Sequence, residues 1–526
     1  TNGHMMKYAV ARPDFTVFEN GNAERISNFC IGNMNNLGYQ VPYGDTGAWT
    51  GSSAEQGTLN TVAFVTGNKA ALWATSLKQS LRPALLFYNF QQSADLAAPT
   101  GFEGVKLWPL EPAYVNTFPA NPRPADNQLF DKISFRNSFD PKTPYILLDG
   151  LNNGGHGHRD GNSLEQLTQF DRIWLADNDY FKSQVKYHNS MQILRDGQAS
   201  ELPSYAALLG HGDSKDYGYS HTQLANYSGA DWDRYVIWLK DQNAFVVLDQ
   251  VTAQESGEFQ CRLLWHGVGA AKMTDDGMFL TQKGPSMWFQ VAQGPKLTLV
   301  NDAELGAKNW NGYKYADPVV RSMDATARVK LQTGQKYLFA SVFHGQENGD
   351  APVWKLNFLQ GYNGVRLVLG PQKIDVQLTE NGIELDKNWL GGLGINGALK
   401  LNDFPGKTVF SESQNINPSK STFTALAPAP KVALAPPIAN LSTEYKAAAY
   451  KTEWSLNPAP KEVLLTGNMG QPGAVKKPAL LTSEPNSEPG GNVLIGGSNA
   501  VSDLLKNSPV MFPLGKTVKL TIDLHQ

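Results

Sequence analysis

Residues 145–197 decide the expected fold, and they read YILLDGLNNGGHGHRDGNSLEQLTQFDRIWLADNDYFKSQVKYHNSMQILRDG. The apolar run at 145–148 predicts a short strand, and the Gly- and Asn-rich segment at 150–155 predicts a flexible turn. A second apolar run at 173–176 predicts a paired strand, and 191–194 alternates as a third. Three of the nine histidines lie in this stretch. It therefore predicts neighbouring strands that carry a group of imidazoles.

These imidazoles suggest a metal site. His156 and His158 are two residues apart, so an extended backbone would place both side chains on one face, about 7 Å apart. Asp177 directly follows the strand at 173–176, and Asp179, two residues further, would face the same side. Two imidazoles and a carboxylate are ligands that zinc takes at about 2.0–2.2 Å. A fourth position left to water or substrate is typical of a site that takes part in chemistry. A lone His-x-His pair is more often a surface or turn feature, so the prediction depends on the whole set.

The set resembles a known family. Gly-Gly-His-Gly-His-Arg-Asp at 154–160, Trp-Leu-Ala-Asp at 174–177 and His-Asn at 188–189 are similar to motifs of the heparinase II/III-like polysaccharide lyases. In that family these motifs mark the β-sandwich half of the active site. The resemblance implies that His156 acts on the substrate. It also implies that His158, Asp177 and His188 bind a structural zinc ion.

Further polar residues are candidates around this site. Arg136 and Arg159 could each pair with a substrate carboxylate, because a guanidinium fork matches a carboxylate; a structural role for Arg136 is equally compatible with the sequence. Asp160 could orient His158 by accepting a hydrogen bond from it. His211 and His221, in HGDSKDYGYSH, are expected to be polar loop residues, with substrate contact or metal ligation as the alternative.

Composition narrows the class of protein. The chain has 526 residues, a net charge of −3 and only 18% charged residues, which argues against a nucleic acid or a polybasic membrane surface as partner. No apolar run reaches the roughly 18 residues that a membrane span needs. Cys30 and Cys261 are the only cysteines and do not make a disulfide framework.

The chain is expected to be mainly β and to divide into consecutive parts. Residues 1–5 resemble an expression-tag remnant. Residues 6–95 are expected to be helical, with helices at 22–37 and 54–77. The loop GYQVPYGDTG at 38–47, with Tyr39 and Tyr43, joins these helices and resembles the last hairpin of the family's α/α toroid.

A large antiparallel β-sandwich is expected over residues 96–425. Its first part, 96–130, is Pro-rich and loop-like, and a strand begins at 130–139. Short apolar runs separated by turns continue to about 425, and residues 227–253 predict a β-hairpin with its turn at 240–243. The Ala- and Pro-rich segment 426–440 predicts a spacer, and 441–526 predicts a small β-domain.

The resemblance implies a polysaccharide lyase that cleaves a uronic-acid-containing polymer by β-elimination, with zinc as structural metal. Two alternatives stay open, namely a uronate C5-epimerase and a non-catalytic carbohydrate-binding β-protein with a structural zinc. The implied partner is an anionic polysaccharide or oligosaccharide. Most of the family's toroid has no counterpart in this sequence, so it could be a separate chain, and a homodimer is a further expectation. The resemblance also implies a bacterial periplasmic or secreted location.

Overall fold

We describe the fold from a computed structural model. It describes residues 5–6, 8–9, 15–44, 46, 49–51, 53–66, 68–77, 96–118, 120, 122–152, 158–177, 183–302, 309–379, 382–385, 388–392, 463–465 and 479–481. The chain divides into two compact units, Thr1–Pro430 and Lys431–Gln526. Each unit is treated below by itself.

The first unit begins with helices α2 (Thr16–Glu19), α3 (Asn22–Gly32), α4 (Ser53–Thr66) and α5 (Lys69–Leu77). The helix expected at 22–37 ends five residues early. Here Asn35 folds the chain into a turn, because its side-chain oxygen accepts hydrogen bonds from the backbone N–H groups of Leu37 and Tyr39, both at 3.0 Å. No helix of the described residues is long and apolar enough to cross a membrane.

The single helix expected at 54–77 is two helices in the structure. The side-chain oxygen of Asn68 accepts a hydrogen bond of 2.9 Å from the backbone N–H of Ala71. An asparagine in this position caps the start of a helix, so α5 begins as a new helix there.

The Pro-rich segment 96–130 is also more ordered than expected. It contains strand β1 (Gly104–Pro109), helix α6 (Pro112–Thr117) and a short 3-10 helix, Asp126–Gln128. Its prolines fit these elements, because Pro109 ends an edge strand and Pro112 stands in the first turn of a helix, where its missing N–H costs nothing.

A nine-stranded antiparallel sheet forms the first layer of the sandwich. The strands that the sequence predicts within residues 145–197 belong to this sheet. Its order is β1-β2-β3-β4-β5-β11-β16-β15, and β6 also pairs with β11. The bounds of its remaining strands are β2 (Phe130–Arg136), β3 (Tyr145–Asp149), β4 (Leu164–Gln169), β5 (Arg172–Ala176), β6 (Met191–Arg195), β11 (Gly257–Val268), β15 (Lys296–Asp302) and β16 (Val320–Leu331).

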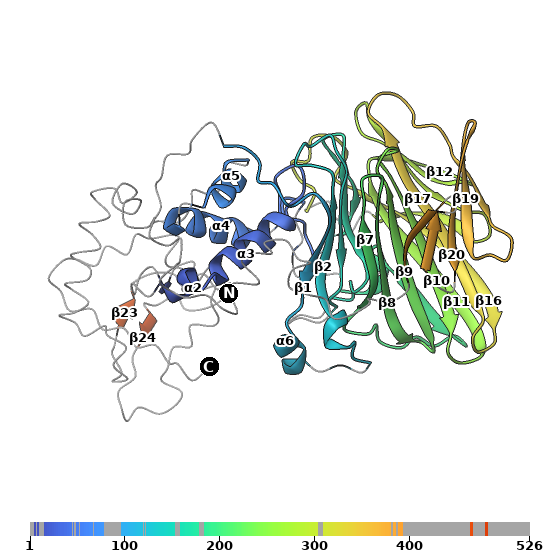
Figure 1. Cartoon of the computed structure of the whole chain (residues 1–526), viewed down its shortest axis with the longest axis horizontal. Coiled ribbons are helices and arrows are strands. Elements are labelled where there is room, and N and C mark those ends of the chain that lie inside the picture. The colour runs from blue at the N-terminus through green and yellow to red at the C-terminus, as the bar shows by residue number, and fades with distance from the viewer. Residues whose placement is uncertain are drawn as a thin grey trace. The chain divides into compact units, whose positions relative to one another are not determined.

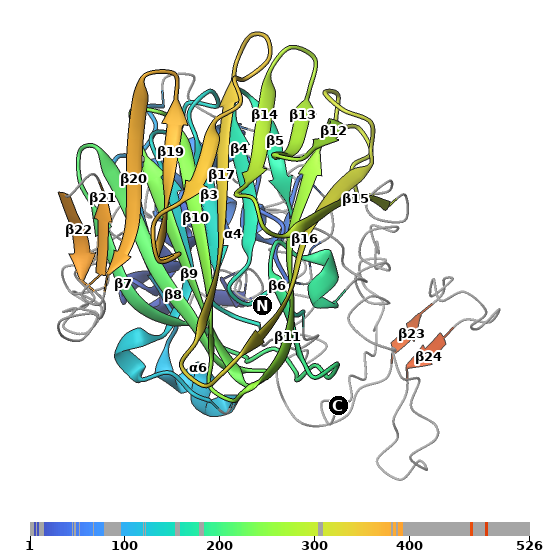
Figure 2. The same ribbon diagram turned by 90° about the vertical axis from the view of Figure 1, so that its right-hand side faces the viewer.

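An eight-stranded antiparallel sheet packs against the first (Figures 1 and 2). Its order is β12-β13-β14-β17-β10-β9-β8-β7. β9 and β10 form the hairpin expected at 227–253. The bounds are β7 (Ala207–Asp213), β8 (Tyr217–Tyr227), β9 (Ala230–Leu239), β10 (Ala244–Ala253), β12 (Ala270–Thr274), β13 (Gly277–Thr281), β14 (Ser286–Val291) and β17 (Lys336–Gln346).

The main hydrophobic core lies between these two sheets. Side chains such as Ile133, Trp174 and Leu263 of the first sheet meet Val236 and Phe339 of the second, and all five are buried. A mainly β fold with large antiparallel sheets, as the sequence predicts, is therefore confirmed. The described helices do not show whether the first segment belongs to a toroid, which stays a prediction.

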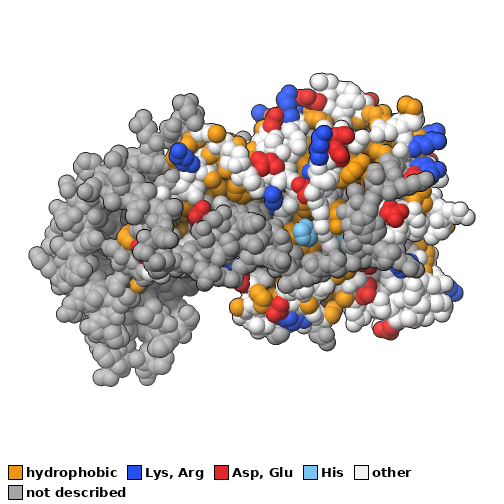
Figure 3. Space-filling view, in the orientation of Figure 1, with side chains coloured by type: hydrophobic (Ala, Val, Ile, Leu, Met, Phe, Trp, Pro, Cys, Tyr) orange, Lys and Arg blue, Asp and Glu red, His pale blue; other side chains and the backbone are white. Residues whose placement is uncertain are grey.

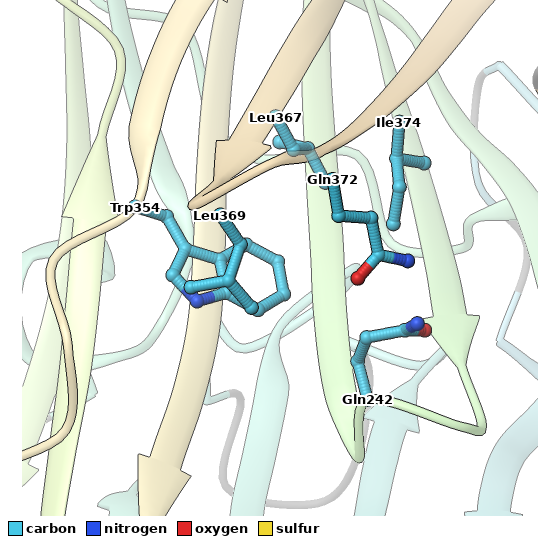
Figure 4. Close-up of a pocket in the computed structure, with 6 residues that line it drawn as sticks. All are labelled: Gln242, Trp354, Leu367, Leu369, Gln372 and Ile374. Atoms are coloured by element: carbon cyan, nitrogen blue, oxygen red, sulfur yellow. The ribbon is translucent and has the colours of Figure 1, made fainter.

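A third, five-stranded sheet covers the outer face of the second sheet. It comprises β18 (Lys355–Phe358), β19 (Gly364–Leu369), β20 (Gln372–Thr379), β21 (Gly382–Leu385) and β22 (Asn388–Gly392). Its Val365 and Val376 pack with Ile237 and Val246 of the second sheet in a separate apolar cluster. A small pocket lies at this contact (Figure 4), lined by Gln242, Trp354, Leu367, Leu369, Gln372 and Ile374.

The second unit is described only in strands β23 (Val463–Leu465) and β24 (Ala479–Leu481), which pair antiparallel. The expected spacer at 426–440 lies outside the described residues, as does most of the C-terminal domain expected at 441–526.

The outer face of the first sheet, turned away from the main core, is polar but buried. Along β2, Ile133 and Phe135 face the core, whereas Lys132, Ser134 and Arg136 alternate with them and are also at most 2% exposed. The segment that follows α3, residues 33–44, covers this face. Gly32 permits the close approach, because a Cβ atom there would lie 1.7 Å from the Trp108 ring. The candidate site lies on this covered polar face.

Candidate metal centre and its acidic surroundings

Asp177 and His188 are in direct contact. Asp177 directly follows β5, and its backbone N–H donates to the carbonyl oxygen of Glu165 on β4 at 2.8 Å. His188 follows a 3-10 turn, Val185–Tyr187. Its Nδ1 lies 2.8 and 2.9 Å from the two carboxylate oxygens of Asp177, and both side chains are buried.

This contact defines the electrostatics of His188. Burial opposes the charged imidazolium, but the charge of Asp177 and its hydrogen bond outweigh burial, so the pKa of His188 rises above its ordinary value. Nδ1 is engaged by Asp177, while the buried Nε2 has no hydrogen-bond partner within the part of the chain that the structure describes. Nε2 is therefore the nitrogen that could ligate a cation.

His158 is the second imidazole of the group. Its side chain is 6% exposed, and its ring centre lies 6.0 Å from that of His188, with the ring planes at 71°. His158, Asp177 and His188, named together from the sequence, thus lie close to one another. His156, the expected catalytic residue, lies outside the described residues, as does the alternative ligand Asp179.

Asn189 fixes the backbone beside the site. Its amide nitrogen donates to the carbonyl oxygens of Leu164 at 2.8 Å and Ala176 at 3.0 Å, and its oxygen accepts from the backbone N–H of His266 at 2.6 Å. One buried side chain therefore ties together β4, β5 and β11, the three strands around the His188 turn.

The two candidate substrate arginines differ in their surroundings. Arg136 is fully buried, and its guanidinium donates to Asn36 and to the carbonyl oxygens of Gly32 and Met34. These contacts give Arg136 a structural role, because it holds the end of α3 against the sheet. Arg159 has a side chain that is 37% exposed and pairs with Glu201 at 2.9 Å, so its guanidinium reaches solvent.

His211 and His221 lie on strands β7 and β8 of the second sheet, not in a loop. His221 is buried, its Nε2 lies 2.7 Å from Asp233, and its ring stacks on Tyr235 at 4.1 Å between centres. Polar residues are frequent around His211 and His221, so the sequence predicted a loop there. In the structure the two strands are joined by a turn of only three residues, 214–216.

A buried acidic cluster was missed from the sequence. Asp149 ends β3, Asp160 precedes β4, and Glu165 lies within β4; their carboxylate oxygens lie within 4.8 Å of one another. A signal was present, because YILLD at 145–149 ends in aspartate just as IWLAD does at 173–177. Glu165 also alternates with the core-facing Leu164, so it had to face the other side of the sheet.

Lys132 partly balances this cluster. Its ammonium group lies 2.9 Å from Asp149 and 2.6 Å from Asp131. Burial opposes its charge, but Asp131 and Asp149 raise its pKa well above the ordinary value. For Asp149, Asp160 and Glu165, burial is the largest influence and raises each pKa, and in each case neighbouring carboxylates raise it further.

The covering segment contacts the cluster through its end. The backbone N–H of Gly44 donates to Asp160 at 2.9 Å, and the ring of Tyr43 lies 4.3 Å from the ammonium group of Lys132. Tyr43, which the sequence placed in the only loop between the expected helices, is thus brought to the same face of the sheet as the acidic cluster.

Comparisons with known proteins give distant matches only. No family model matches the chain, and no curated protein matches it. Among solved structures the chain is similar to a heparinase III, with 10% identity and a TM-score of 0.49 over 66% of this chain and 53% of that one. It is also similar to a mutant of the heparan sulfate lyase HepC from Pedobacter heparinus, with 14% identity and a TM-score of 0.45 over 66% and 51%. The chain therefore spans about half the length of these structures. Similarity of this size does not establish a family or an activity.

Proposed function

We propose that this chain is a polysaccharide lyase that cleaves a uronic-acid-containing polymer by β-elimination. The observation that carries the proposal is the contact between Asp177 and His188, with the ring of His158 beside that of His188. His158 follows His156 by two residues in the sequence. The motifs at 154–160, 174–177 and 188–189 gave this grouping from the sequence, and they are the motifs that resemble heparinase II/III-like lyases.

The residues present suit the zinc ion that the resemblance implies. Imidazole nitrogens are ligands that zinc prefers, and the buried Nε2 of His188 has no other partner among the described residues. A carboxylate on Nδ1 fixes the tautomer that leaves Nε2 unprotonated. His158 and His188 would hold the ion, whereas Asp177 contacts Nδ1 on the other side of the His188 ring and would orient that ring. The ion would supply a fixed positive charge that holds these segments together.

His156 is the proposed base. It is two residues from His158, so a fixed His158 would restrict where the His156 ring can reach. A neutral imidazole with an ordinary pKa of about 6.5 can accept the C5 proton of a uronate near neutral pH. The electron pair left at C5 then forms the double bond to C4 as the C4–O bond breaks, and the leaving glycosidic oxygen takes a proton from an acid or from water.

The substrate carboxylate must be neutralised for that proton to become acidic. Arg159 is the candidate for this contact, because it is partly exposed, follows His158 in sequence and carries a guanidinium that can bind a carboxylate through two hydrogen bonds. Lys and Arg side chains are interspersed with Asp and Glu over the face of the sandwich seen in Figure 3. Recognition of an anionic polymer would therefore depend on such local contacts.

The test is a lyase assay on a panel of uronate polymers, read by the ultraviolet absorbance of the unsaturated uronate product. We expect product from the wild-type chain, supplied with the rest of the enzyme if that is a separate chain, and at least about 100-fold less from His156→Ala. His211→Ala, on β7 of the second sheet, is the matched control and should retain activity. Epimerised product without absorbance, or sugar binding without turnover, would reject the lyase in favour of an epimerase or a binding protein.

A further inference from the structure

Two aspartates meet beneath the segment that covers the first sheet. Asp149 and Asp160 are each 2% exposed. One oxygen of Asp149 accepts from Lys132 at 2.9 Å and from the backbone N–H of Leu151 at 2.8 Å. One oxygen of Asp160 accepts from the backbone N–H of Gly44 at 2.9 Å. Both carboxylates are thus held in place by groups that favour their ionised form.

Glu165 points into this pair from the neighbouring strand and has no partner of its own. Its side chain is 0% exposed, and neither carboxylate oxygen has a hydrogen-bond partner among the residues that the structure describes. A carboxylate oxygen of Glu165 nevertheless lies within 4.8 Å of ligand atoms of both aspartates. A buried carboxylate without a partner is strongly disfavoured, so a partner of positive charge or a proton is required.

Within the part of the chain that the structure describes, one lysine forms an ion pair with this group. Lys132 contributes one positive charge and shares it between Asp131 and Asp149. His188 is engaged by Asp177, a further carboxylate that acts on Glu165. Among the described residues, three buried carboxylates therefore share one ammonium group, and Glu165 is not in contact with it.

We propose that Asp149, Asp160 and Glu165 bind a calcium ion, at a site separate from His158, Asp177 and His188. Calcium takes oxygen ligands only and favours carboxylates, whereas zinc prefers a set that includes nitrogen or sulfur. Its ligand distances of 2.3–2.6 Å allow two ligand oxygens to be up to about 5 Å apart, which covers the separations here. This inference does not depend on the proposed lyase activity.

The ion would link three parts of the chain. Asp149 belongs to β3 and Glu165 to β4, while Asp160 holds Gly44 at the end of the segment that follows α3. Bound calcium would thus lock this covering segment, with Tyr43, onto the sheet. Calcium binding should stabilise the chain, because an ion that binds only the folded state raises its melting temperature.

The experiment removes all metals from the full-length chain with EDTA and then restores calcium alone or zinc alone. Bound metal is measured by mass spectrometry after gel filtration, and the melting temperature by differential scanning fluorimetry. We expect the wild-type chain to bind about one calcium ion and to melt several degrees higher with it. Glu165→Gln and Asp160→Asn should weaken calcium binding at least about tenfold. Glu111→Gln, which changes an exposed carboxylate on the surface, is the control and should bind calcium like the wild type.

Three results would overturn the proposal. The first is a wild-type chain that takes up no calcium, a result that needs no variant to fold. The second is calcium binding that is unchanged in both Glu165→Gln and Asp160→Asn. The third is a Glu165→Gln chain that is at least as stable as the calcium-loaded wild type. Because glutamine mimics a protonated glutamate, this result would show that Glu165 carries a proton and not a bound ion. Zinc uptake is measured separately, so a failed zinc site would not be mistaken for a failed calcium site.

Discussion

At the scale of single residues, an acidic partner in contact decides which buried histidines can carry charge. Asp177 raises the pKa of His188 despite burial, whereas burial lowers the pKa of His266 to about 4 and that of His344 to about 3. The difference arises because a buried imidazole becomes charged only where an acidic partner contacts it. His344 has a neutral partner instead, the side-chain oxygen of Gln290 at 2.7 Å.

His344 should make the fold sensitive to mild acid. Its pKa is about 3 when folded, against about 6.5 for an exposed histidine, so between these values the unfolded chain binds more protons. Stability therefore falls as pH decreases, by about 2 kcal/mol from this residue between about pH 7.5 and about pH 5. Urea unfolding at both pH values measures the free energy of unfolding. Its decrease from the higher to the lower pH should be smaller by about 2 kcal/mol in His344→Gln than in the wild type. An equal pH dependence in both chains would contradict the assignment.

At the scale of elements, buried polar side chains add links between segments beyond those that backbone pairing provides. Asn189 bridges β4, β5 and β11, and Arg136 fastens the end of α3 to β2. In the sequence, nothing distinguishes these two residues from other polar residues. Their roles become visible only when the groups that they bind are brought together by the fold.

Replacing Asn189 with alanine should destabilise the chain by about 3 kcal/mol, because it leaves buried backbone groups of Leu164, Ala176 and His266 without their partner. Chemical unfolding measures this loss. Asn116→Ala, at an exposed position on α6, is the matched control and should change stability by less than about 0.5 kcal/mol. Similar small effects of both substitutions would show that Asn189 does not join the strands.

At the scale of the whole molecule, the two large sheets are held together by one apolar core. Trp265 of β11 lies at its centre with 0% exposure, packs edge-on against Phe343 of β17 and donates from Nε1 to Ser341 at 3.1 Å. The third sheet adds a second apolar cluster on the far side of the second sheet. The candidate site lies outside both clusters, on the outer face of the first sheet.

Trp265→Ala should therefore cost about 4 kcal/mol of unfolding free energy, because it leaves a cavity between the sheets that neighbouring side chains fill only in part. Ser341→Ala removes the hydrogen-bond acceptor but no bulk, and should cost about 1 kcal/mol. Equilibrium urea unfolding compares the two. A loss for Trp265→Ala no larger than that for Ser341→Ala would show that packing at this position does not hold the sheets together.

The sequence by itself determined the mainly β, antiparallel fold and the strands within 145–197, because alternation is a local property of the chain. Its motifs, through their resemblance to a known family, also gave the grouping of His158, Asp177 and His188. The end of α3 at Gly32 and the break before α5 depended on side-chain contacts of Asn35 and Asn68 that periodicity does not reveal. Strand β1, within 96–130, depended on its pairing with β2. Only the tertiary structure brought Asp149, Asp160 and Glu165 together and buried Arg136. Those outcomes follow from which strands pair and what covers them, and the free energy of burying a charge depends on neighbours that are distant in sequence.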